Sequence, residues 1–255
     1  MKINKDTLLP LLMFSQEFKY SENITVYPVK MKDILMFQAF SQSIIVRKNS
    51  VFRDKKIIKM SYLEFLLYCF NNRALEEQYE INGLSDYFLY ALHLLQLCCR
   101  EARVGINKQS GNIFINEEEI TPQIFDDLRR IIILQNDIDF DIDEFINSDT
   151  EKYLQRAQKM LNKSKNDPNI EDYIDSLVIA MHTSEDVIMK MTIRKFYRYL
   201  KRYRLCEFYQ IAKAGESSGF VKYKEPLEYW MVSLDVNDKY SEVKTDENEL
   251  RGKVH

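Results

Sequence analysis

The sequence predicts a mainly α-helical protein with a short N-terminal strand and a small β-hairpin near residues 103–116. Three observations support this fold class. Glycine and proline, which form turns, number only 6 and 5 among 255 residues. Apolar residues recur at three- and four-residue spacing along most of the chain, as in amphipathic helices. Alternation of apolar and polar residues, typical of strands, is confined to short stretches near 23–29 and 103–116.

The first half of the chain predicts one strand followed by three helices. Residues 23–29 alternate up to Pro28, which favours a short edge strand. Residues 31–46 are apolar nearly all round and predict a buried helix. Ser61 and Glu64 have the spacing of a capping box before the apolar run 63–70. The next helix starts at Ser85 and Asp86, and it carries one apolar face that extends to Ala102.

A hairpin and another helix follow. Residues 103–116 alternate about a turn at Lys108-Gln109-Ser110-Gly111, as in a β-hairpin. Thr121 and Pro122 then have the order of an N-cap followed by proline at the first helical position. This helix is expected to run to Gln135 and Asn136.

An acidic stretch with aspartate at every second residue follows this helix. It lacks the glycine and glutamate of a calcium-binding EF-hand loop, because Ile142 and Ser148 stand at those positions. Four carboxylates on one face of a strand would need further ligands to hold a divalent ion. An acidic linker whose last members cap the next helix is the preferred interpretation. The residues concerned are Asp137, Asp139, Asp141 and Asp143.

The C-terminal part predicts further helices over 150–163 and 170–181, joined by a turn at 166–169. From residue 236 onward the composition is charged and aperiodic, which is typical of a disordered tail. We therefore expect three regions. They are an N-terminal α+β region, 1–146, a C-terminal helical region, 147–235, and the tail, 236–255.

The helix expected after Thr183 is basic on one face and aromatic-aliphatic on the other. Seven bases and no acid lie between Lys190 and Arg204. Such a face can bind nucleic acid, because bases stack on the interleaved tyrosines. It can equally be a solvated face, or pair with acids of the same chain, since residues 117–151 hold twelve acids against two arginines. The shared face comprises Arg194, Arg198, Lys201 and Arg202.

The opposite face of this helix predicts a buried stripe at three- and four-residue spacing. A left-handed cap at Gly215 is expected to end the helix. Trp230, in the segment after the helix, either packs on the helical core or is exposed for a partner. The stripe consists of Ile193, Phe196, Tyr197, Leu200, Tyr203, Phe208 and Ile211.

No catalytic, cofactor or metal motif withstands inspection. Residues 215–219 match the G-x-S-x-G of a hydrolase nucleophile elbow, but a helix rather than a strand is expected before them. His255, the last residue, is the one histidine downstream of Ser217. A lone histidine such as His93, inside an apolar helix, is more often a core or boundary residue than a ligand. We expect no enzyme, no cofactor and no bound metal.

Composition narrows the class further. The net charge of −3 gives no overall attraction to nucleic acid or acidic membranes. The apolar run 8–14 is too short for a membrane span, contains Pro10 and is followed by no cleavage site, so we expect neither a signal peptide nor a membrane segment. The four cysteines form no CxxC pair, and we expect reduced thiols. They are Cys69, Cys98, Cys99 and Cys206.

Three pieces of the sequence together resemble tail assembly chaperones and related tail-gene products of phages that infect low-GC Gram-positive bacteria. They are ITVYPVKMKDILMF near the start, EEITPQIFDDLRRIIILQND after the hairpin, and SLVIAMHTSEDVIMKMTIRKFYRYL. The pieces span most of residues 23–200. None of them is a catalytic motif.

The resemblance implies a non-enzymatic, mostly helical protein in the host cytoplasm that binds the tape-measure and tail-tube proteins. Homo-oligomers are also consistent with it. The alternatives are a structural virion component of the tail, baseplate or connector, and a nucleic-acid-binding protein that uses the basic-aromatic helix at 190–204. The candidate partner-binding residues are Arg194, Lys195, Arg198, Tyr199, Lys201, Arg202 and Trp230.

Overall fold

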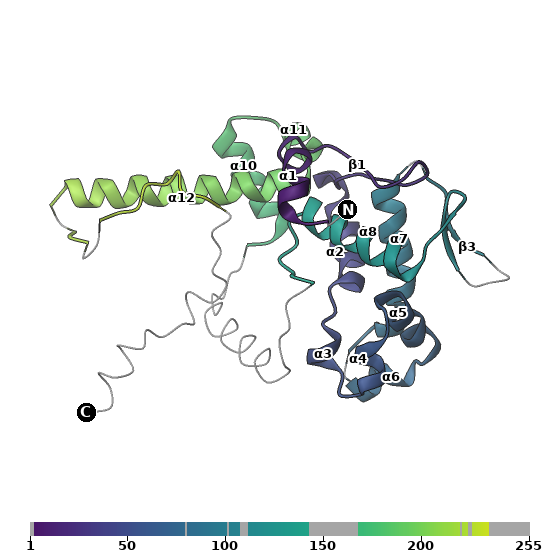
Figure 1. Cartoon of the computed structure of the whole chain (residues 1–255). Coiled ribbons are helices and arrows are strands. Elements are labelled where there is room, and N and C mark those ends of the chain that lie inside the picture. Colours follow the sequence, from purple (N-terminus) through teal and green to yellow (C-terminus); the bar gives the residue numbers. More distant parts are fainter. Residues whose placement is uncertain are drawn as a thin grey trace, which may run out of the picture. The chain divides into compact units, whose positions relative to one another are not determined.

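The computed structural model describes residues 3–79, 81–100, 102–107, 112–142, 168–219, 221–223 and 226–234. It confirms a mainly helical fold with a two-stranded sheet near the N-terminus and a small three-stranded sheet (Figure 1). The chain divides into two units, Met1–Lys152 with Ser184–Phe196, and Tyr153–Thr183 with Tyr197–His255. The expected regions 1–146, 147–235 and 236–255 stay predictions. The predicted helix 150–163 and the predicted tail lie outside the described residues.

The first unit contains most of the described elements. Its α-helices are α1 (Lys5–Phe14), α2 (Ile34–Ser41), α3 (Lys48–Val51), α4 (Lys55–Lys59), α5 (Tyr62–Asn71), α6 (Ala74–Tyr79), α7 (Tyr87–Cys99), α8 (Pro122–Gln135) and α11 (Glu185–Lys190). Its 3-10 turns are η1 (Met31–Asp33), η2 (Gln42–Ile44) and η3 (Leu84–Asp86). Its strands are β1 (Phe18–Lys19), β2 (Thr25–Val26), β3 (Val104–Ile106), β4 (Ile113–Ile115) and β5 (Glu118–Glu119).

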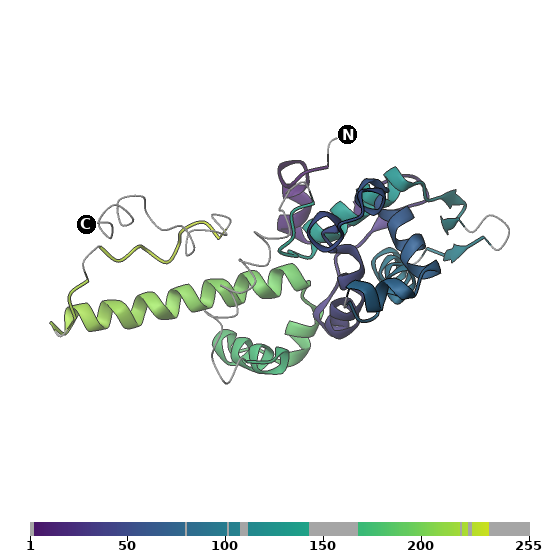
Figure 2. The ribbon, with the colours of Figure 1, turned by 90° about the horizontal axis from the view of Figure 1, so that it is seen from below.

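The second unit contains α10 (Ile170–Met181) and, from Tyr197 onward, α12 (Ile193–Ser217). Figure 2 shows α10 beside the N-terminal half of α12. A side-chain contact joins the two helices, because the Arg204 guanidinium carbon lies 4.9 Å from the Tyr173 ring centre. The two helices therefore pack against each other within this unit.

Helix starts follow the sequence closely. Ser61 and Glu64 form the predicted capping box at α5. Thr121 caps α8 by accepting a hydrogen bond from the Ile124 N–H at 3.3 Å, with Pro122 at the first helical position. Asn169 and Asp172 form another capping box, at the start of α10. These caps satisfy N–H groups that the first helical turn leaves without a partner.

Both sheets are antiparallel. The predicted hairpin is confirmed in its strands, which pair with Gly105 opposite Phe114, while its turn lies outside the described residues. The sequence analysis did not foresee β5, which extends this sheet beside β4. It also did not foresee β1, which pairs with β2 so that Phe18 lies opposite Val26.

The Tyr27–Val29 segment joins several elements of the first unit. The Tyr27 N–H donates to the Cys98 carbonyl at 2.8 Å, and Arg100 Nη2 donates to the Pro28 carbonyl at 2.9 Å. The Val29 N–H donates to Asn136 Oδ1 at 2.9 Å, and the Val29 carbonyl accepts from the Ile193 N–H at 2.9 Å. The ends of α7 and α8 and the start of α12 thus meet at this irregular segment. It belongs to the first of the three sequence pieces that resemble tail-gene products.

Residues 31–46 differ from the buried helix that the sequence predicts. They form η1, α2 and η2 in succession, and only one side is covered. Phe37 is buried, but Leu35 and Met36 are 67% and 49% exposed. The physical reason is that α2 packs against α7 on one side only, so its other side faces solvent even though it is apolar. The sequence does not show which side is covered.

The core of the first unit contains a buried tyrosine whose titration is predicted to control stability at high pH. The Tyr62 hydroxyl donates to the Ser43 carbonyl at 2.9 Å and accepts from the Val46 N–H at 3.0 Å. The Arg129 guanidinium carbon lies 3.6 Å from the centre of its ring. Burial is the largest effect on this phenol and raises the pKa of Tyr62 to about 12.

We expect the free energy of unfolding to fall as the pH rises from about 10 to about 12, because a phenol in the unfolded chain already ionises near 10. The stabilising contribution of Tyr62 is complete below the pKa of the unfolded phenol and is lost as the pH passes the raised folded pKa.

Urea unfolding between pH 9 and 11.5 measures this loss. Tyr62→Phe should lose less stability over that range than the parent chain; an equal loss would contradict the assignment. Some loss should remain in the variant, because the pKa of Tyr20 is also raised to about 12, first by burial and then by its hydrogen bond to Asp127.

Candidate functional site

The hydrolase-like motif has the wrong surroundings for catalysis. Ser217 is the last residue of α12, and Gly215 lies inside that helix, so a helix precedes the serine where an elbow requires a strand. His255 lies outside the described residues. Among the residues that the structure describes, no three histidine, cysteine, aspartate or glutamate side chains gather as metal ligands.

Arg194 does not share an accessible face with the other basic residues of its helix. Its side chain is 6% exposed, and Nη1 lies 2.8 Å from Asp137 Oδ1. Asp137 belongs to the acidic stretch and has a left-handed backbone, with φ of 56°. Pairing with an acid of the same chain, one of the three interpretations of the basic face, therefore applies to Arg194. The burial leaves this guanidinium unable to reach a partner.

The other basic candidates of α12 remain closer to the surface. Lys201 is exposed, Tyr199 is 42% exposed, and Lys195 and Arg198 are half-buried. Each of these four side chains makes contacts within the chain. Their predicted role in partner binding stays a prediction.

Arg202 of α12 binds the backbone of the segment that follows the helix. Its Nη1 donates to the Trp230 carbonyl and its Nη2 to the Val232 carbonyl, the latter at 2.9 Å. Its guanidinium carbon also lies 5.9 Å from the Trp230 ring centre. Trp230 is half-buried, so the segment 226–234 lies against α12, while the neighbouring Tyr229 remains 52% exposed.

The apolar stripe of α12 is buried only in its first turns. Ile193, Phe196 and Leu200 are at most 4% exposed, as predicted. Phe208 and Ile211 are 65% and 68% exposed, so the prediction of a continuous buried stripe is wrong beyond Leu200. The reason is that an apolar side becomes core only where another element covers it.

The end of α12 also differs from the prediction. The helix passes through Gly215 and ends at Ser217, and the left-handed glycine is Gly219, with φ of 78°. A β-carbon at Gly215 would lie 3.6 Å from a Val221 side-chain carbon. Gly215 thus faces the returning chain instead of capping the helix.

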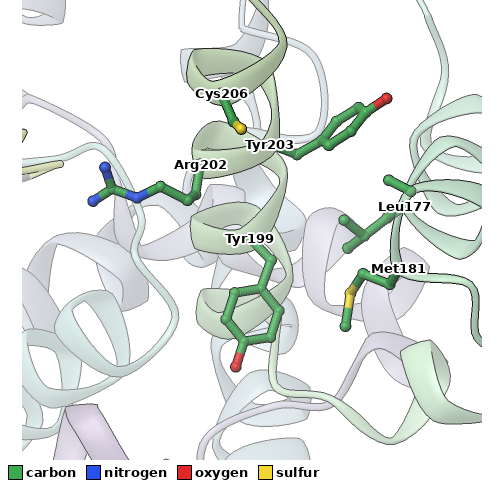
Figure 3. A pocket seen from close by; sticks show the side chains of 7 residues that line it. Leu177, Met181, Tyr199, Arg202, Tyr203 and Cys206 are labelled. Carbon is green, nitrogen blue, oxygen red and sulfur yellow. The ribbon is translucent and has the colours of Figure 1, made fainter. Parts of the chain in front are cut away.

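An open apolar groove lies between α10 and α12, entirely within the second unit (Figure 3). Its volume is about 250 Å³. Leu177 and Met181 point from α10 toward Tyr199 and Tyr203 of α12 in the figure, whereas Arg202 points to the other side. Ala180 completes the lining on α10 and Cys206 on α12. We call this site the α10–α12 groove.

The lining positions follow helical geometry. On α12 they are spaced at i, i+3, i+4 and i+7, which is one face over two turns. On α10 they are Leu177, Ala180 and Met181, one face over one turn. Sequence patterns predict Tyr199 and Arg202 as partner-binding residues, but they do not single out the α10 side. The apolar pattern of α10 was visible in the sequence, but a core-facing interpretation fits that pattern equally well.

Arg202 and Arg204 of α12 bring positive charge near the groove. Arg202 contacts backbone carbonyls and an indole ring, and Arg204 contacts the Tyr173 ring. Neither contacts a carboxylate within the part of the chain that the structure describes. Positive charge therefore lies close to an apolar groove.

A second pocket of about 250 Å³ lies in the first unit between α7 and β3, lined in part by Leu92, His93 and Ile106. The His93 ring stacks on Phe40 at 5.3 Å between ring centres. His93 is otherwise exposed, so it lies at the boundary between the Phe40 ring and solvent.

Part of the chain is similar to a known protein family. Residues 162–235 match the family described as the YomV second domain, a family of proteins from a Bacillus prophage region. No curated protein and no solved structure matches the chain. Every residue that lines the α10–α12 groove lies within the matched segment. The part of the chain that is similar to a known family is thus the part that carries the groove.

A search of the described helices for one that is long and apolar enough to cross a membrane found none.

Proposed function

We propose that this protein acts without catalysis in phage tail morphogenesis, as an assembly chaperone that binds tape-measure or tail-tube proteins through helical surfaces. The observation that carries the proposal is the open α10–α12 groove, with exposed aromatic side chains beside it. The match of this segment to a prophage family supports a phage origin. Assembly of this kind takes place in the host cytoplasm.

The exposed apolar surface of the second unit supports a binding function. Large apolar side chains left in water cost free energy, so a cluster of them commonly marks a binding surface. The segment 168–234 contains several such side chains. On α12 and the segment after it, those at least half exposed are Phe208, Ile211, Tyr229 and Met231.

The test is co-expression of the full chain with the tape-measure and tail-tube proteins encoded in the same phage genome. We expect one of them to co-purify with the chain in an interaction that resists nuclease treatment. A tape-measure protein that is insoluble when expressed alone should become soluble. Failure of both proteins to bind would contradict the proposal.

Two further results would support the alternatives. Recovery of the chain in purified virions, with no effect on tape-measure solubility, would favour a structural tail, baseplate or connector component. Binding to DNA or RNA that weakens steeply between low and physiological salt would favour a nucleic-acid-binding protein using residues 190–204.

A further inference from the structure

We propose that the α10–α12 groove binds an acidic amphipathic helix from another protein. The bound helix would present apolar side chains at positions i, i+3 or i+4, and i+7, flanked by carboxylates. This inference rests on the proposed binding function and specifies the chemistry of the partner.

The shape of the groove favours a helix. The lining of α12 runs over eight residues, from Tyr199 to Cys206, and so extends roughly 10 Å along the helix axis at 1.5 Å per step. A partner helix that repeats apolar residues over two turns matches this length, and a helix lying in an apolar groove is a common recognition mode. A volume of about 250 Å³ accommodates a small number of aliphatic or aromatic side chains.

The charge near the groove favours carboxylates on that helix. Between Ile193 and Cys206 the sequence has six bases and no acid. Arg194 is neutralised by Asp137, but Arg202 and Arg204 contact no carboxylate among the described residues. Arg202 points away from the groove (Figure 3), but the Arg204 guanidinium lies over Tyr173, one helical turn before Leu177 on α10. A negatively charged partner would therefore gain attraction from Arg204, whereas a basic partner would be repelled.

The acids of α10 do not oppose this preference. The groove side of α10 carries Leu177, Ala180 and Met181. Glu171 and Asp175 are exposed, and at 100° per residue they project from the side of α10 away from the groove. The carboxylate nearest to the groove on α12 is Glu207, which accepts a hydrogen bond from the Tyr203 hydroxyl at 3.3 Å.

The remaining helix that the sequence predicts in this chain is a poor occupant. Residues 150–163 contain four bases and one acid, so this segment would bring further positive charge to a basic groove. A second copy of α10 fits poorly as well. Ile179 is the one large apolar side chain in the middle of its exposed side and is 73% exposed, which gives too little apolar surface for two turns of groove.

Nucleic acid is less suited to this site than a helix. Phosphate groups need donors that point toward them, but both Arg202 Nη atoms donate to the backbone of residues 230 and 232. The α10 side of the groove, Leu177, Ala180 and Met181, offers no side-chain donor, and on the α12 side the Tyr203 hydroxyl already donates to Glu207.

The experiment measures binding of synthetic peptides to the full chain by fluorescence anisotropy. The first probe is a 21-residue amphipathic helix with leucine at i, i+3, i+4 and i+7 and glutamate on its flanks. The second has the same leucines with lysine on the flanks, the third is a scrambled acidic peptide, and the fourth is the sequence of residues 150–163. We expect the first peptide to bind at least about tenfold more tightly than each of the others, because it alone combines the apolar spacing with acidic flanks.

Two neighbouring substitutions on α10 locate the binding site. Ala180→Glu places a carboxylate in the apolar groove, and we expect it to weaken binding of the first peptide at least roughly tenfold. Ile179→Glu adds the same charge on the exposed side of the same helix and should leave binding unchanged. Circular dichroism checks that both variants fold, and Leu177→Met, which retains an apolar side chain, should bind like the parent chain.

A second pair of substitutions tests the charge. Arg204→Glu should weaken binding of the acidic peptide roughly tenfold and strengthen binding of the basic one. Lys222→Glu, an exposed position outside both helices, should change neither affinity. Equal binding of acidic and basic peptides, or equal effects of the two reversals, would overturn the proposal.

The remaining outcomes also decide the question. Preference for the 150–163 peptide, displacement of the acidic peptide by single-stranded DNA, or dimers that block the groove would each overturn the inference. Binding of a tail protein that survives Ala180→Glu would refute the groove inference and leave the proposed function standing. Binding of the acidic peptide in the groove, with no tail protein bound anywhere, would refute the proposed function alone.

Discussion

Asp137→Asn is expected to lower the free energy of unfolding by about 2 to 3 kcal/mol, because it leaves the buried Arg194 charge without its carboxylate. Arg194 is 6% exposed and Asp137 22%, and their side chains are 2.8 Å apart. Asparagine tolerates the left-handed backbone of residue 137. The substitution therefore tests the charge and not the backbone. Urea unfolding at neutral pH measures the effect.

Asp175→Asn is the matched control, since it removes the same charge from an exposed position on α10. Its effect should remain within about 0.5 kcal/mol. The double variant Arg194→Met with Asp137→Asn should be less destabilised than the sum of the two single variants, because removing both charges leaves neither one unpaired. Additive effects would show that the two side chains do not stabilise each other, which would contradict the assignment of the pair.

Asn136→Ala is expected to cost about 2 to 3 kcal/mol, because it leaves the buried Val29 N–H without an acceptor. Asn136 is 2% exposed. Its Oδ1 accepts from Val29, and its Nδ2 donates to the Ile132 carbonyl at 2.9 Å. The loss should appear as a lower urea midpoint with an unchanged slope. It should also increase hydrogen exchange at Val29, which joins strand β2 to the ends of two helices.

Asn72→Ala is a close control for this substitution. Asn72 also follows the last residue of a helix, α5, and its Nδ2 donates to the carbonyl four residues earlier, Tyr68, at 2.8 Å. It is exposed, and among the described residues it makes no long-range bond comparable to that of Asn136 with Val29. We expect a change within about 0.5 kcal/mol. Equal losses in the two variants would show that the local helix-end bond, and not the bond to Val29, is what matters.

The resembling sequence pieces gain a structural explanation from these contacts. The piece with Tyr27-Pro28-Val29 and the piece that ends in Gln135-Asn136 meet through the bond between Val29 and Asn136. The third piece reaches the same place, because the Ile193 N–H donates to the Val29 carbonyl and the Met31 N–H to the Met191 carbonyl. Three stretches far apart in the sequence thus stabilise one junction of the first unit, which is a structural role.

The candidate site was predictable only in part. Tyr199 and Arg202 stood out in the sequence because bases and tyrosines alternate there without acids. Leu177, Ala180 and Met181 did not, since an apolar helix side looks the same in a sequence whether it is covered or left open. Arg194 was grouped with the accessible bases because its spacing matches theirs, and only its contact with Asp137 distinguishes it.

The sequence by itself determined where helices and hairpin strands form, because caps, turn residues and apolar periodicity act over a few neighbouring residues. Thr121-Pro122, Ser61 with Glu64, and the alternation about residues 103–116 belong to this local kind. The tertiary structure alone decided which helix sides are covered. Phe196 became core while Phe208, on the same helix, stayed 65% exposed. The physical reason is that burial depends on elements brought together from distant parts of the chain. A local sequence pattern does not show which of these elements packs on a given helix side.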